Sequence, residues 1–151
     1  MSDRFPLAAD NFGAEERAAV QEVMTSGRYT MGEKVQAFER RLAEWTGAKE
    51  AVMVNSGSSA NFLLVASALY RWNQQSRLRP GDEVLVPSLS WPTTVWPLVQ
   101  LGLIPVFVDI DPTTLAMDLK AAEQALSPKT KGVFLIHVLG LAADMQGWVQ
   151  F

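Results

Sequence analysis

The sequence predicts an α/β fold, in which a mainly parallel sheet forms the middle layer of a three-layer α/β/α arrangement. Two observations support this prediction. Short segments that are apolar throughout alternate with segments of helical length, which is typical of a parallel sheet covered by helices on both faces. The 151 residues are 48% hydrophobic and 19% charged, a composition typical of a globular protein with a buried core. Ligands of such sheets bind at the carboxyl ends of the strands.

The first 47 residues are expected to form an irregular N-terminal arm and two helices. Acidic residues in the first turn and Gly27 just past the last turn predict a helix over 14–26. A second helix is predicted over 32–46, and Gly47 is the expected left-handed residue after it. The apolar residues of this second helix fall on one face: Val35, Phe38, Leu42 and Trp45.

Residues 48–151 are expected to form the α/β domain, in which turns rich in glycine and proline separate strands from helices. The expected strands cover 51–55, 83–87, 105–110 and 132–138. The expected helices cover 58–72, 93–101, 117–126 and 143–151.

The composition argues against several classes of protein. A net charge of -3 and a pI near 5.1 do not fit a nucleic-acid-binding protein, which normally carries a basic patch. With no cysteine and a single histidine, the chain cannot form a thiolate or a histidine-rich metal site. No apolar stretch resembles a secretory signal or approaches the roughly 20 residues of a membrane span. A cytoplasmic protein is therefore expected.

A serine-rich turn follows the first expected strand and begins the next helix. Gly57 lets a ligand approach the backbone, and the hydroxyls of Ser56, Ser58 and Ser59 add donors. Free N–H groups and the dipole at a helix start favour an anion, so the turn could hold a phosphate. An N-cap without any ligand fits the same residues. The residues alone leave these two alternatives open.

Trp91 follows the second expected strand, on a backbone that Pro92 stiffens. Its indole could stack on a flat ring ligand, or it could pack over the edge of the sheet. Taken alone, the residue favours packing, because buried aromatic side chains mostly belong to the core.

Other polar groups are expected to have structural roles. Asp109 and Asp111 end the third expected strand beside a turn, where acids commonly cap backbone N–H groups instead of binding metal. His137 lies in an apolar segment and is expected to be a hydrogen-bonded core histidine. None of the five lysines lies in an apolar segment that would favour Schiff-base chemistry.

Seven short motifs occur in order along nearly the whole chain. They are Arg-Tyr-Thr-Met-Gly at 28–32, Phe-Glu at 38–39, Thr-Gly-Ala at 46–48, Asn-Ser-Gly-Ser-Ser-Ala-Asn at 55–61, Pro-Gly-Asp-Glu-Val at 80–84, Pro-Ser-Leu-Ser-Trp at 87–91 and Pro-Val-Phe-Val-Asp-Ile-Asp at 105–111. This order resembles the DegT/StrS-like sugar aminotransferase family. Its members are pyridoxal-phosphate (PLP) enzymes of fold type I that act on nucleotide-linked keto sugars for surface polysaccharides and antibiotics.

The resemblance implies a cofactor site. PLP would be held by the turn of Ser56, Gly57, Ser58 and Ser59, and Trp91 would stack on its pyridine ring, which reverses the preference for packing. It further implies a nucleotide-sugar substrate, an amino-acid donor that is usually glutamate, and a homodimer in the complete enzyme. Neither nucleic acid nor a membrane is an expected partner.

The resemblance also implies that this chain is the N-terminal portion of such an enzyme. In the family, the Schiff-base lysine and the acid that pairs with the pyridine nitrogen lie further along than Phe151, so no catalytic residue is expected here and the chain alone would be inactive. Its apolar last residues predict an exposed apolar edge.

Two alternatives to an aminotransferase remain. The stretches 56–61, 71–79 and 91–94 are also similar to the nucleotide-sugar 3-dehydratase branch of the family. Those enzymes have a histidine in place of the lysine and remove a sugar hydroxyl. The other alternative is a non-catalytic remnant or binding module.

Overall fold

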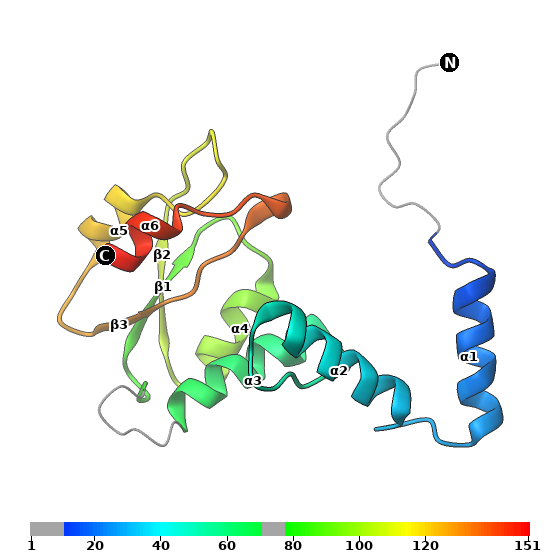
Figure 1. Ribbon diagram of the computed structural model, residues 1–151. Coiled ribbons are helices and arrows are strands. Elements are labelled where there is room, and N and C mark those ends of the chain that lie inside the picture. The colour runs from blue at the N-terminus through cyan, green and yellow to red at the C-terminus, as the bar shows by residue number, and fades with distance from the viewer. Residues whose placement is uncertain (1–10, 71–77) are drawn as a thin grey trace, which may run out of the picture. The chain divides into compact units, whose positions relative to one another are not determined.

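The computed structural model describes residues 11–70 and 78–151 (Figure 1). The chain divides into two compact units, Met1–Met53 and Val54–Phe151. Each unit is described by itself. None of the described helices is long and apolar enough to cross a membrane. Within the same ranges, no three histidine, aspartate or glutamate side chains are grouped as metal ligands would be.

The first unit contains the two predicted helices, α1 (Ala14–Ser26) and α2 (Glu33–Thr46). Both end as the sequence predicts, at glycines in the left-handed conformation: φ is 67° at Gly27 and 72° at Gly47. The expected apolar face of α2 is only partly covered, since Trp45 is 85% exposed.

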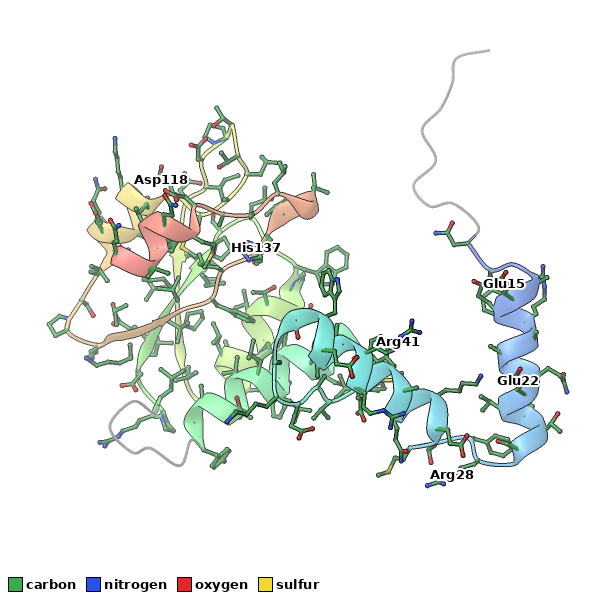
Figure 2. The ribbon with its side chains drawn as sticks, in the orientation of Figure 1. Glu15, Glu22, Arg28, Arg41, Asp118 and His137 are labelled. Atoms are coloured by element: carbon green, nitrogen blue, oxygen red, sulfur yellow. The ribbon has the colours of Figure 1, made fainter. Side chains whose placement is uncertain are left out.

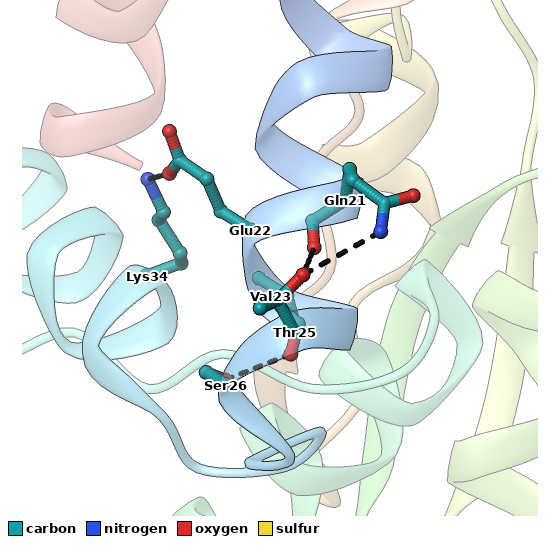
Figure 3. Close-up of polar contacts among 6 residues, drawn as sticks. All are labelled: Gln21, Glu22, Val23, Thr25, Ser26 and Lys34. Atoms are coloured by element: carbon teal, nitrogen blue, oxygen red, sulfur yellow. Dashed lines mark hydrogen bonds and ion pairs between the residues drawn. The ribbon is translucent and has the colours of Figure 1, made fainter.

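Polar contacts join the two helices and close the end of α1 (Figure 3). The ammonium of Lys34 lies 2.6 Å from a carboxylate oxygen of Glu22 and lowers the pKa of that carboxyl. Because both side chains are exposed, the pair adds little stability. In the last turn of α1 the hydroxyls of Thr25 and Ser26 donate to the carbonyls of Gln21 and Val23.

The second unit is built on three parallel strands in the order β2-β1-β3. These are β1 (Glu83–Pro87), β2 (Ile104–Val108) and β3 (Thr130–Val133). In the register of the sheet, Leu85 of the central strand is opposite Val106 on one side and Val133 on the other. The central strand has neighbours on both sides, and its last four residues are buried.

Helices cover both faces of this sheet, as Figure 1 shows. They are α3 (Gly57–Leu69) and α4 (Pro92–Gln100) on one face and α5 (Leu119–Ala125) and α6 (Met145–Gln150) on the other. Side chains alternate across β1, so Val84 and Val86 pack with α3 and α4, while Leu85 packs with α5. The predicted α/β fold with a parallel sheet between helical layers is confirmed.

The expected strand over 51–55 is wrong, because this segment is not part of the sheet. A strand needs a hydrogen-bonded neighbour, and the strands of the described sheet pair only with one another, in the order β2-β1-β3. No described segment pairs with residues 51–55, and Val52 is 78% exposed. The apolar run therefore indicates a tendency to be buried that the described chain does not satisfy.

The third strand, β3, ends at Val133, five residues earlier than expected. The N–H of Phe134 still donates to the carbonyl of Leu85 at 2.8 Å. In a parallel ladder the next donor would be the N–H of residue 87, but Pro87 has none. The pairing therefore stops there, and the chain continues into a short turn, η2 (Val138–Gly140), in which Leu139 has a φ of 52°.

The other boundaries differ from the expected ones by only a few residues. Asp118 and Asp144 cap the starts of α5 and α6 by accepting backbone N–H groups, so both helices begin two residues later than predicted. The helix α3 starts at Gly57, and its predicted end at residue 72 lies outside the described residues.

Candidate functional site

The serine turn has two kinds of serine. Ser56 is the N-cap of α3, and its hydroxyl oxygen accepts the N–H of Ser59 at 3.1 Å. The hydroxyl of Ser59 donates to the side-chain oxygen of Asn55 at 2.7 Å. Both hydroxyls are thus engaged in holding the turn, which confirms the N-cap interpretation for Ser56. This capping does not exclude a ligand, because other donors of the turn stay free.

Those free donors belong to Gly57 and Ser58. Their N–H groups are in the first turn of α3 and have no intrahelical partner. The Ser58 side chain is exposed and makes no hydrogen bond in the described structure. A Cβ added at Gly57 would meet no atom within 4 Å, so packing inside the protein does not require glycine there. These groups could hold a phosphate at the start of α3.

The turn opens on a hollow of about 520 Å³. Ser58, Ser59 and Asn55 give this hollow its polar side, and Phe62 and Leu63 of α3 contribute apolar wall. The hollow is wide open to solvent, so it is an open cradle.

Trp91 lies at the other candidate position. It is the N-cap residue of α4, directly before Pro92, and it is 73% exposed. The indole is therefore not packed into the core, contrary to the preference that the residue alone suggests. It lines a second hollow of about 450 Å³, together with Asn61, Thr94 and residues 134–139.

The serine turn and Trp91 open on separate hollows that share no lining residue. A hydrogen bond connects their two helices: the side-chain N–H of Asn61 on α3 donates to the carbonyl of Thr93 on α4 at 3.3 Å. Both residues lie near the N-terminal ends of their helices. The bond therefore holds the beginnings of α3 and α4 side by side.

His137 is the residue whose surroundings the sequence predicts incorrectly. It lies beyond the end of β3 and is exposed, so it is not a core histidine in a strand (Figure 2). Its expected hydrogen bond is present, since Nδ1 accepts the backbone N–H of Ala143 at 3.1 Å. It lines the same hollow as Trp91. The apolar residues before it obscured this position, because they resemble a longer strand.

The two aspartates that follow β2 have the structural roles that the sequence predicts. Asp111 accepts both the hydroxyl and the backbone N–H of Thr113, and these hydrogen bonds lower the pKa of its carboxyl. Asp109 accepts the N–H of Ile110 at 2.8 Å and the hydroxyl of Ser88 at 3.4 Å. These contacts tie down the loop after β2.

Comparison with known proteins identifies close relatives. Over 140 residues the chain is 43% identical to GDP-4-keto-6-deoxy-D-mannose 3-dehydratase of Yersinia pseudotuberculosis, covering 93% of this chain and 35% of that protein. The protein of the same name from Escherichia coli O55:H7 is 42% identical over 136 residues, covering 90% and 34%. The chain thus spans about a third of the length of the curated relatives it matches.

Solved structures agree with this comparison. The E. coli 3-dehydratase with bound hydrated PLP matches 97% of this chain and 37% of its own, with a TM-score of 0.89 and 39% identity. A Streptococcus pneumoniae protein described as a sugar aminotransferase, in its PMP form, matches 97% of this chain and 35% of its own, with a TM-score of 0.84 and 29% identity. The model of the DegT/DnrJ/EryC1/StrS aminotransferase family matches residues 10–151. As its ordered motifs predict, the chain belongs to this family.

Proposed function

We propose that this chain supplies part of the cofactor site of a PLP- or PMP-dependent 3-dehydratase that acts on a nucleotide-linked 4-keto-6-deoxy sugar. The observation that carries the proposal is the 43% identity to a named GDP-4-keto-6-deoxy-D-mannose 3-dehydratase over nearly the whole chain. The solved sugar aminotransferase is less similar, at 29% identity. The dehydratase alternative is therefore favoured over the aminotransferase that the family name suggests.

The cofactor part of the proposal depends on the residues at the starts of α3 and α4. The free N–H groups of Gly57 and Ser58 and the hydroxyl of Ser58 suit the phosphate of PLP. Trp91 offers an exposed indole that a pyridine ring can cover. When bound, the cofactor supplies an electron sink for removing a hydroxyl from the sugar. Gly57, Ser58 and Trp91 would bind and orient it.

The remaining site of the enzyme is also proposed by analogy with the relatives. The substrate would be a GDP-linked keto sugar and the amine source glutamate, in a homodimeric protein. An aminotransferase remains the second candidate, favoured by the family model that matches residues 10–151.

A dehydratase and an aminotransferase would release sugars of different elemental composition. The protein expressed from its complete gene is given the GDP-linked 4-keto-6-deoxy sugar, PLP and glutamate, and the product is analysed by mass spectrometry. A dehydratase yields a sugar that has lost one hydroxyl oxygen and contains no new nitrogen. An aminated sugar that retains that oxygen would contradict the proposal and support the aminotransferase. Reactions without glutamate are the control for unconverted substrate.

The alternative of a non-catalytic binding module is tested by measuring both PLP binding and product formation. If PLP binds but neither product forms, the binding module is supported and the dehydratase is contradicted. Binding itself is measured by the change in PLP absorbance and by the gain in melting temperature. A stabilisation of about 2.7 kcal/mol requires ligand at about 100 times its dissociation constant.

A further inference from the structure

The hollow beside Trp91 contains His137, the only histidine in the chain. Its ring is exposed, and it lies on the segment that the early end of β3 releases from the sheet. Asn61 and Thr94 contribute polar lining, and Phe134 and Leu135 add apolar wall. The imidazole and the indole therefore border one space at the carboxyl end of the sheet.

A backbone contact determines which nitrogen of His137 is free. Nδ1 accepts the N–H of Ala143 at 3.1 Å, and Ala143 itself is buried. A neutral imidazole that accepts through Nδ1 carries its proton on Nε2. In the described part of the chain Nε2 has no hydrogen-bond partner. The ring is thus anchored at one nitrogen and presents a donor at the other.

We propose that His137 contacts the ligand of this hollow, donating a hydrogen bond from Nε2–H to a polar atom on the ring of a phosphorylated heteroaromatic compound. This inference rests on the proposed PLP site, because Trp91 is the surface that would cover that ring. A ligand that displaces water from between the indole and the apolar wall strengthens a hydrogen bond made there. His137 would then orient the ring in this hollow, while the phosphate would extend past the adjoining starts of α3 and α4 to the serine turn, which opens on a separate hollow.

The two nitrogens of His137 can be tested separately. In His137→Asn the amide oxygen occupies the place of Nδ1 and still accepts the N–H of Ala143, but nothing replaces Nε2–H. In His137→Phe the aromatic volume stays and both nitrogens are lost. The variants are made in the protein expressed from its complete gene, and affinities for PLP and for inorganic phosphate are measured by calorimetric titration. Melting temperatures without ligand report on the anchor.

We expect His137→Asn to melt like the wild type and to bind PLP about five-fold more weakly, the loss of one hydrogen bond worth about 1 kcal/mol. His137→Phe is expected to lose the same affinity and to melt at a lower temperature. Affinity for inorganic phosphate should not change in either variant. Unchanged PLP affinity in both variants would overturn the inference, and so would a weaker affinity for inorganic phosphate.

Trp91→Ala distinguishes this inference from the proposed function. Trp96→Ala is its matched control, since Trp96 is also exposed on α4 but does not line the hollow. If Trp91→Ala weakens PLP binding and the His137 variants do not, the cofactor site stands and the role of His137 is wrong. If Trp91→Ala binds PLP like Trp96→Ala, or the wild type binds no PLP, the cofactor site itself is wrong and the inference fails with it.

Discussion

At the scale of single residues, some serines of the serine turn stabilise the fold and another is available to a ligand. Ser56 and Ser59 use their hydroxyls to build the N-terminus of α3, whereas the hydroxyl of Ser58 has no partner in the described ranges 11–70 and 78–151. The sequence predicts the turn and its donors, but it cannot say which serine does which task. That distinction depends on rotamers, which are determined by Asn55 and by the first turn of the helix.

Alanine substitutions at Ser58 and Ser56 should therefore affect different properties, the first PLP binding and the second folding stability. Ser58→Ala is expected to weaken PLP binding by about 0.5–1.5 kcal/mol without changing the melting temperature, because its hydroxyl has no hydrogen-bond partner among the described residues. Ser56→Ala removes the N-cap and should lower the free energy of unfolding by about 1 kcal/mol. Titration calorimetry and chemical denaturation measure the two effects. Equal PLP affinity in Ser58→Ala and the wild type would contradict the phosphate role.

Asp111 offers a prediction about pH. The Thr113 hydroxyl is the largest cause of the lowered pKa of Asp111, and the Thr113 backbone N–H adds to it. A carboxyl whose pKa is lower in the folded state stabilises the fold above its unfolded pKa, and this contribution is lost as pH falls through the folded pKa. Thr113→Val should raise the pKa of Asp111 toward its ordinary value, as measured by carbon-13 NMR of the carboxyl.

The backbone donor is the internal control for this prediction, because Thr113→Val retains the N–H bond. The pKa of Asp111 should accordingly stay somewhat below the ordinary value in the variant. A titration curve identical to that of the wild type would show that the hydroxyl does not determine the pKa.

At the scale of elements, the sequence predicts where helices end better than it predicts which strands pair. The glycines after α1 and α2 lie where the sequence places them. One strand assignment is wrong and another extends too far, and both errors concern hydrogen-bonding partners. The segment 51–55 is apolar but has no neighbour in the described chain, and β3 stops because Pro87 cannot donate to it. Periodicity reports a tendency to be buried, whereas a strand also requires a donor and an acceptor opposite it.

The candidate site likewise combines features that the sequence predicts with features that it does not. The starts of α3 and α4 are predictable because small residues and proline mark them in the sequence. The bond from Asn61 to the Thr93 carbonyl, which holds these starts together, joins residues 32 positions apart. His137 comes into the site only because the chain leaves the sheet early. Both features depend on tertiary geometry that no local pattern encodes.

At the scale of the whole unit from Val54 to Phe151, one strand supports two cores. Leu85 belongs to the cluster on the α5 face, and Val84 and Val86 belong to the cluster with α3 and α4, which also contains Leu98. Because the clusters share β1, neither layer can be lost without exposing the central strand. The unit should therefore unfold as one cooperative structure.

Leu85→Ala and Leu98→Ala test this cooperativity from opposite faces of the sheet. Each leucine is almost completely buried, so each substitution should lower the free energy of unfolding by about 2–5 kcal/mol. The exposed Leu89 gives the matched control, and Leu89→Ala should change the free energy of unfolding by less than about 0.5 kcal/mol. Urea unfolding is followed by hydrogen exchange of β1 and of α4. If the two cores were independent, Leu85→Ala would leave the protection of α4 unchanged; a shared core instead requires both elements to lose protection together in either variant.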